Sequence, residues 1–126
     1  MMKQIIKTDK APAPIGPYNQ AILSNGTLYI SGQIAIVPAT GNLLLDDVET
    51  ETHQVMKNLQ AILAEANMSF ENVIKTSIFL MDMGSFAKVN EVYGSYFLDN
   101  FPARETVQVS CLPKMVNVEI SMIASL

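Results

Sequence analysis

Charged and metal-binding side chains are scarce in this chain of 126 residues. Asp, Glu, Lys and Arg make up 16% of it, where about 25% is usual for soluble domains, and the net charge is −4. A nucleic-acid surface needs grouped Lys and Arg, and no such cluster exists, so we expect no nucleic-acid partner. One His and one Cys form no recognisable set of metal ligands and exclude an internal disulfide, so we expect no metal.

Long apolar runs and targeting segments are missing as well. No run approaches the ~18 apolar residues of a membrane span, and the first residues show neither a signal peptide nor an Arg-rich transit segment. We therefore expect a cytoplasmic protein with no membrane partner. Cys111 lies on an apolar strand face and is predicted to be a buried core thiol. His53 lies off the apolar stripe of its helix and is predicted to be solvated.

Apolar side chains, by contrast, make up 49% of the chain. The length predicts a single domain, residues 1–126. Alternating or β-branched runs indicate strands at 2–7, 20–23, 27–31, 73–81, 106–111 and 116–124. Periodicity close to 3.6 residues indicates two helices: one from Asp46, an N-cap paired with Glu49, to Asn67, and one from a cap at 82–85 to Phe97.

The order of these elements predicts a two-layer α+β domain, in which two helices cover one face of a six-stranded mixed sheet. Asn25-Gly26, between two apolar runs, predicts a two-residue hairpin turn. Gly94 inside the second helix indicates that something packs closely against it. The second face of the sheet has no layer to cover it, so we expect the protein to self-associate through that face.

The segment 106–124 is expected to form a hairpin around which the rest of the chain is organised. A two-residue turn at 113–114 would pair Val109 with Val118. In that register every apolar side chain of both arms falls on one face and every polar side chain on the other. We expect the apolar face to pack on the core.

The polar face of this hairpin is where we place the chemistry, with Arg104 at its head and Glu119 further along. These two side chains either hold opposite ends of a small ligand or face each other across a subunit boundary; a merely solvated face is the alternative. The loop 11–18 contains three prolines and is either a rigid binding loop or a stiff connector. Gly32, just past a strand, permits close approach by a ligand or forms a bulge.

Six short motifs, in this order and spacing, carry a resemblance to a known family. They are IGPY at 15–18, SGQI at 31–34, VN-x-x-Y at 89–93, FPAR at 101–104, LPK at 112–114 and VEI at 118–120. Each motif alone is weak, but together they resemble the Rid (YjgF-type) reactive-intermediate deaminases from about Ile5 to Ala124.

The resemblance implies a chorismate-mutase-like fold and a homotrimer with its sites in clefts between subunits. It also implies a reaction: hydrolysis of 2-imino acids, such as 2-iminobutanoate and 2-iminopropanoate, to 2-oxo acids and ammonia. These imines form from enamines such as 2-aminoacrylate. The resemblance implies no cofactor and no metal.

The residues fit this chemistry. A guanidinium grips a carboxylate through two parallel hydrogen bonds, which makes Arg104 the candidate for the substrate carboxylate. Glu119 is the candidate to orient the water that adds to the C=N carbon and to return a proton to the leaving amine. Tyr18 is expected to close the cleft. Further positions that match family pocket residues, and are expected to contact the substrate, are Ser31, Gly32, Asn90 and Thr106.

The chain departs from the family pattern beside the arginine. Glu105 replaces a residue that is usually small and uncharged, and by alternation it should point away from Arg104. Thr106 stands where many members have Cys, which alters the polarity of the pocket. Two other functions remain open: a sensor that binds a small carboxylate without turnover, and an endoribonuclease or translation inhibitor, against which the negative net charge weighs.

Overall fold

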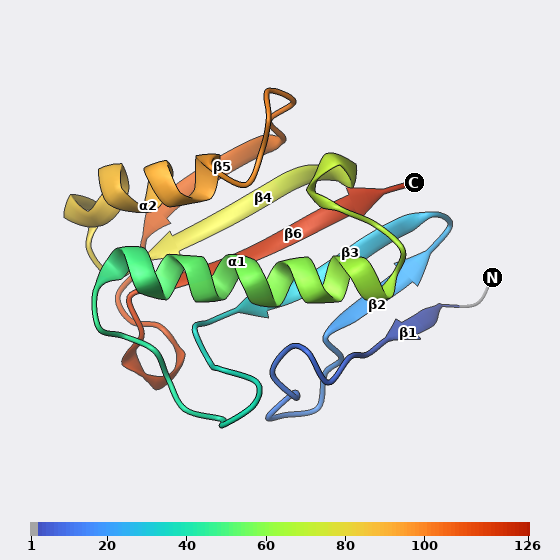
Figure 1. Ribbon diagram of the computed structural model, residues 1–126, viewed down its shortest axis with the longest axis horizontal. Helices are drawn as coiled ribbons and strands as arrows, with labels where there is room; N and C mark the ends of the chain where they lie inside the picture. Colours follow the sequence, from blue (N-terminus) through green and yellow to red (C-terminus); the bar gives the residue numbers. More distant parts are fainter. Residues whose placement is uncertain (1–2) are drawn as a thin grey trace.

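The structure is a computed structural model that describes residues 3–126 as a six-stranded sheet with two helices on one of its faces (Figure 1). The strand order is β1-β2-β3-β6-β4-β5, and the predicted α+β class is confirmed. The strands are β1 Gln4–Ile6, β2 Ala21–Ser24, β3 Thr27–Gln33, β4 Val73–Leu80, β5 Ala103–Gln108 and β6 Val118–Ser125. The helices are α1 Val48–Glu65 and α2 Phe86–Gly94. Met2, in the first predicted strand, lies outside the described residues.

Helix α1 supplies much of the core. Its side chains with 0% exposure are Glu51, Thr52, Val55, Met56, Leu59, Ile62 and Leu63. The N-cap is Asp47 and not Asp46 as predicted: the Asp47 side chain accepts a hydrogen bond from the Thr50 N–H at 2.7 Å. Two adjacent aspartates offer the same cap in the sequence, and Asp47 has the extended backbone of an N-cap. Asn67 follows the helix at φ 59°, which confirms the predicted stop.

Two predictions that rested on glycine have opposite outcomes. The turn between β2 and β3 holds Asn25 at φ 52° and Gly26 at φ 77°, so the predicted hairpin is confirmed. The predicted close packing at Gly94 is wrong. Gly94 is the last residue of α2, and a Cβ added there would meet no atom within 4 Å.

The predicted C-terminal hairpin is also wrong, because β4 lies between its two arms. β5 pairs with β4 in parallel and β6 pairs with β4 antiparallel. Val109, expected opposite Val118, donates its backbone N–H to the Leu80 carbonyl at 2.9 Å, and a short 3-10 turn occupies Pro113–Met115. Alternation within two segments fits equally well whether they are neighbours or flank a third strand, so it could not decide the pairing.

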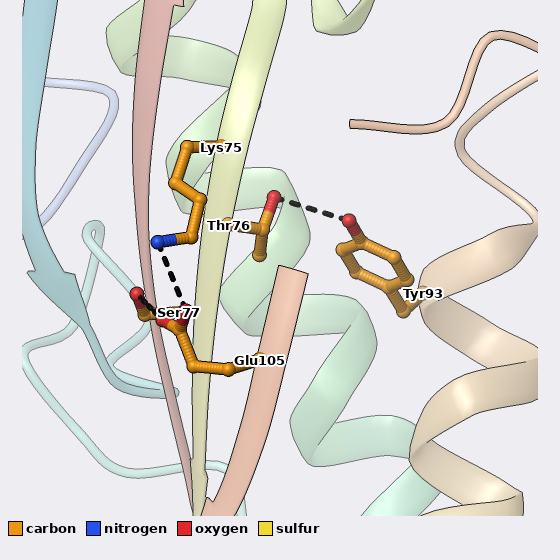
Figure 2. A network of polar contacts seen from close by, with 5 residues as sticks. All are labelled: Lys75, Thr76, Ser77, Tyr93 and Glu105. Carbon is orange, nitrogen blue, oxygen red and sulfur yellow. Dashed lines mark hydrogen bonds and ion pairs between the residues drawn. The ribbon is translucent and has the colours of Figure 1, made fainter. Parts of the chain in front are cut away.

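The two faces of the sheet have different surroundings (Figure 2). On β4, Thr76 faces the helices, where its hydroxyl oxygen accepts a hydrogen bond from Tyr93 of α2 at 3.0 Å. The next residue, Ser77, points to the face without helices, which we call the open face, and bonds to Glu105 there. Arg104 pairs with Thr76, and paired residues share a face, so Arg104 lies on the helix face.

Glu119 lies on the open face, opposite to Arg104. Gln108 of β5 pairs with Leu80, whereas Glu119 of β6 pairs with Phe79, and these neighbours on β4 point to opposite faces. The prediction that Arg104 and Glu119 share one polar face is therefore wrong within a single chain. The intervening strand shifts the register by one residue relative to the expected hairpin.

The open face carries apolar side chains as well as polar ones. Tyr29 is 51% exposed and Val107 is 41% exposed, although Val107 was predicted to pack on the core. Cys111, predicted to be a buried thiol, is exposed because it lies in the loop after β5 and not on a strand. Within residues 3–126, neither helix is long and apolar enough to cross a membrane.

A candidate active site divided between two clefts

The first cleft, which we call the Glu119 cleft, has a volume of about 500 Å³. It lies between the proline-rich loop, β3 and β6. Its apolar lining comes from Pro12, Ala13, Ile15, Ile34, Ile36 and Pro113. Its polar groups include Tyr18, Ser31 and Glu119, three of the predicted site residues. An apolar pocket with a few convergent polar groups is typical of small-molecule sites.

The loop that carries Tyr18 is fastened to the sheet by two polar side chains. The buried Gln20 donates from its side-chain amide to the loop carbonyls of Pro12 at 2.8 Å and Ala11 at 3.3 Å. Ser31 donates its hydroxyl to the Asn19 carbonyl at 2.7 Å. The Ser31 hydroxyl, predicted to contact substrate, thus holds the loop in place, and Tyr18 projects with 48% of its surface exposed.

Gly32 lies in a β-bulge directly above Glu119. The register between β3 and β6 shifts between Ile30 and Gln33, so Ser31 and Gly32 together oppose one residue of β6. A Cβ added to Gly32 would lie 2.4 Å from Oε2 of Glu119. The predicted bulge is confirmed, and the close approach by a ligand stays a prediction. The group that lies close to Gly32 is the Glu119 carboxylate of the same chain.

Glu119 is half-buried and unpaired. Burial raises the pKa of its carboxyl group above the ordinary value. Residues 3–126 offer its carboxylate no hydrogen-bond or ion-pair partner. A desolvated carboxylate without a partner is a stronger base than a solvated one, which suits proton transfer. Over the same residues no group of three or more His, Cys, Asp or Glu side chains is placed to hold a metal ion.

The second cleft, which we call the Arg104 cleft, has a volume of about 470 Å³ and lies between α2 and β5. Nη1 of Arg104 donates to Oδ1 of Asn90 at 2.7 Å. The guanidinium carbon lies 5.2 Å from the ring centroid of Tyr93 and 5.7 Å from that of Phe86. In the described part of the chain no carboxylate pairs with this guanidinium. It is therefore able to bind the carboxylate of a ligand.

The two residues that follow Arg104 differ in direction. Glu105 points to the open face, as predicted, where a hydrogen bond from Ser77 and then the Lys75 ammonium at 2.9 Å lower the pKa of its carboxyl group. Thr106 shares the face of Arg104, and its hydroxyl is buried with no hydrogen-bond partner among residues 3–126. The departure at Glu105 is thus kept away from the guanidinium.

One chain does not bring all the predicted site residues together. They form two groups: Tyr18, Ser31, Gly32 and Glu119 in one, and Asn90, Arg104 and Thr106 in the other. The sheet separates the carboxylate from the guanidinium. A site that uses both therefore requires a second copy of the chain.

Sequence reasoning missed Glu51, which positions the strand that carries Glu119. Glu51 is 0% exposed, and its carboxylate accepts hydrogen bonds from the backbone N–H groups of Asn117 at 2.8 Å and Val118 at 3.0 Å. These bonds anchor the first residue of β6. The signal was present, because Glu51 falls on the apolar stripe of α1, three residues after Val48, where a carboxylate needs buried partners.

These features define a two-layer α+β protein with an unpaired acid in one cleft and an unpaired cation in another. The sequence model of the family described as Endoribonuclease L-PSP matches residues 8–126, and the chain belongs to this family. A Yersinia pestis protein of the conserved Rid family YyfA has 48% identity and a TM-score of 0.97 over 99% of this chain and 100% of its own. The resemblance to the Rid family is confirmed.

One further relative is named for a reaction, and another has a crystal structure with a bound ligand. The human 2-iminobutanoate/2-iminopropanoate deaminase is 46% identical over 124 residues, 98% of this chain and 90% of its own length. Escherichia coli TdcF, whose crystal structure contains bound serine, is 38% identical, with a TM-score of 0.94 over 98% of each chain.

Proposed function

We propose that this protein hydrolyses 2-imino acids, such as 2-iminobutanoate and 2-iminopropanoate, to 2-oxo acids and ammonia. The observation that carries the proposal is that the chain holds both a half-buried carboxylate without a partner, in one cleft, and a guanidinium that no acid neutralises, in another. The name of the human relative, at 46% identity, supports the reaction. The serine bound to TdcF supports a small carboxylic acid as the ligand.

Glu119 acts as the proton carrier of this reaction. Its carboxylate removes a proton from water as the water oxygen bonds to the imine carbon and the C=N electron pair moves to nitrogen. The acid then returns that proton to the nitrogen. Glu119 next carries the proton of the new hydroxyl to the same nitrogen, so that a C=O bond forms as the C–N bond breaks and ammonia leaves. Because burial raises the pKa of Glu119, the group both takes up and returns a proton readily.

Arg104 binds the carboxylate of the substrate. The Asn90 amide oxygen occupies one hydrogen of Nη1, which leaves the Nε–Nη2 edge of the guanidinium for a bidentate contact. Tyr18, on the rigid loop of the Glu119 cleft, covers the substrate. The buried hydroxyl of Thr106, which lacks a partner, lies on the same strand face as Arg104 and contributes to the polarity of that side.

The site forms between copies of the chain in a homotrimer. Arg104 and Glu119 lie on opposite faces of one sheet, so a substrate that contacts both must lie between two subunits. The open face, with the apolar side chains of Tyr29 and Val107 exposed, is the surface that association would bury. In a closed ring each subunit would offer its Arg104 cleft to the Glu119 cleft of the next.

A mixing experiment tests the reaction and the shared site together. Arg104→Ala and Glu119→Gln should each be inactive on imines generated in situ and trapped as semicarbazones. If the two variants are unfolded together at equal amounts and refolded, random assembly restores about a quarter of the sites in a head-to-tail ring. Activity that stays at background would contradict the shared site. Full activity of either variant alone would contradict the assigned roles.

The family description also raises ribonuclease activity, which the same preparations can test. The net charge of −4 and the lack of a basic cluster weigh against a phosphate-binding surface. A sensor that binds 2-oxo acids without turnover is the other alternative. It would show saturable binding that Arg104→Ala removes and no imine hydrolysis above background.

A further inference from the structure

The guanidinium of Arg104 lies beside two aromatic rings from the same helix. Its carbon is 5.2 Å from the ring centroid of Tyr93 and 5.7 Å from that of Phe86. Both distances fall within the ~6 Å range of cation–π contacts. The rings are seven residues apart on α2, which places them on one side of the helix. We call this pair of rings the aromatic cradle.

We propose that Phe86 and Tyr93 are positioning residues that hold the guanidinium of Arg104 in the orientation in which it binds a carboxylate. The inference rests on the proposed function, in which Arg104 binds the substrate carboxylate. It adds that the affinity of this contact depends on two residues that act through Arg104.

The two rings are fixed in different ways. Tyr93 is 3% exposed, and its hydroxyl donates to Thr76 of β4 at 3.0 Å, so its ring is locked between helix and sheet. Phe86 is 38% exposed and belongs to neither of the hydrophobic clusters found among residues 3–126. A large apolar ring outside the core does little for the stability of the fold. Its contact with the Arg104 guanidinium indicates that its role is to orient that group.

The two neutral rings can restrict the guanidinium without neutralising its charge, which an acidic partner could not do. Arg has several rotatable bonds, and an Asp or Glu beside it would fix it but would also occupy its donors and cancel its charge. The rings restrict the guanidinium through its faces, and Asn90 takes one Nη1 hydrogen at 2.7 Å. The remaining edge stays charged and free. Restricting a binding group before the ligand arrives raises affinity because less motion is lost on binding.

The exposed ring gives a clean experiment. We would compare wild type, Phe86→Leu and Phe86→Tyr for the dissociation constant of 2-oxobutanoate and for KM and kcat of imine hydrolysis. Phe86→Leu should weaken 2-oxobutanoate binding and raise KM by about threefold or more, the loss expected for one cation–π contact, while kcat stays close to wild type. Phe86→Tyr restores a ring and should recover the affinity.

Two controls separate positioning from a general structural effect. Met83 is 38% exposed, like Phe86, and lies just before α2, so Met83→Leu should leave affinity and KM unchanged. The uncharged amide of 2-oxobutanoate should bind Phe86→Leu as it binds wild type. The thermal midpoint should not separate Phe86→Leu from Phe86→Tyr. Tyr93→Phe keeps the ring and should retain more of the affinity than Phe86→Leu does.

The outcomes also separate this inference from the proposed function. If Arg104→Ala abolishes binding while Phe86→Leu binds 2-oxobutanoate as wild type does, the cradle has no positioning role and the carboxylate clamp stands. If Phe86→Tyr is as weak as Phe86→Leu, the ring is not the cause and the inference is overturned. If Arg104→Ala binds and turns over like wild type, the proposed function fails, and the cradle with it.

Discussion

The charged residues of the Glu119 cleft and the Arg104 cleft have opposite surroundings. Glu119 is half-buried and has no partner in residues 3–126, so its charged form is disfavoured. Arg104 is held by Asn90 and lies beside two rings, so its charge and its orientation are both kept. A group that must exchange a proton benefits from lacking partners, whereas a group that must bind an anion benefits from being held. The difference matches the two roles.

The two clefts are also built from different material. Backbone shape builds the Glu119 cleft: a proline-rich loop, a β-bulge and a glycine that leaves room for the carboxylate. Side chains of α2 hold the guanidinium in the Arg104 cleft. Substitutions at a backbone feature of the Glu119 cleft should therefore lower kcat sharply. Substitutions in the Arg104 cleft should weaken substrate affinity gradually.

The largest effect should come from removing the proton carrier. Glu119→Gln keeps the shape of the side chain but cannot take a proton, so kcat for imine hydrolysis should fall by about 10²- to 10⁴-fold. The dissociation constant for 2-oxobutanoate should change little, because Arg104 is intact. Stopped-flow turnover and equilibrium titration measure the two quantities separately. A loss of binding as large as the loss of turnover would contradict the assignment of proton transfer to one cleft and carboxylate binding to the other.

A change at the bulge should come next in size. In Gly32→Ala the new methyl group would lie 2.4 Å from Oε2 of Glu119, so the carboxylate must move. Misplacing a catalytic group by about 1 Å can cost ~10²-fold in rate. Activity of Gly32→Ala equal to that of wild type would show that the position of the carboxylate is not critical.

The sequence was informative wherever chemistry is local. Asn25-Gly26 specified the hairpin, Asn67 the end of α1, and the amphipathic patterns both helices. The six short motifs identified the family because each is a run of neighbours. The direction of Glu105, away from Arg104, also followed from simple alternation.

What the sequence could not reveal was non-local. Nothing in residues 106–124 states that β4 inserts between β5 and β6, so the faces of Arg104 and Glu119 were misassigned. Cys111 was judged from a strand pattern in a segment that forms a loop. The carboxylate of Glu51 finds its partners 66 residues away along the chain, at Asn117. Such contacts arise only when elements pack.

Loosening the grip on Arg104 should have a graded effect on affinity. Asn90→Ala removes the acceptor that lies 2.7 Å from Nη1. A hydrogen bond to a charged group is worth about 1.5 kcal/mol or more, so KM should rise by roughly tenfold with kcat little changed. Asn90→Asp places a carboxylate beside the guanidinium and should raise KM further, because it competes with the substrate. A fall in kcat at constant KM would contradict this assignment.

The smallest expected effect is on stability, which the two acids on the open face, Glu119 and Glu105, should change in opposite directions. Burial raises the pKa of Glu119 above 4.5 in the folded state. Well below that value the carboxyl is protonated in both states, and as pH rises through the folded pKa the protein must ionise a desolvated group and loses stability. Glu119→Gln stays neutral, so it should be more stable than wild type at pH 8, by urea denaturation, with no advantage near pH 4.

Glu105 should behave in the opposite way, because the hydrogen bond from Ser77 and the nearby Lys75 lower the pKa of its carboxyl group. Its stabilising contribution is present above the unfolded pKa and is lost as pH falls through the folded pKa. Glu105→Gln should therefore be less stable than wild type at pH 8, and salt should shrink the difference since the pair is exposed. If Glu105→Gln and Glu119→Gln changed stability at pH 8 in the same direction, burial would not control the protonation of Glu119. The contrast between the unpartnered carboxylate of Glu119 and the held guanidinium of Arg104 would then have no physical basis.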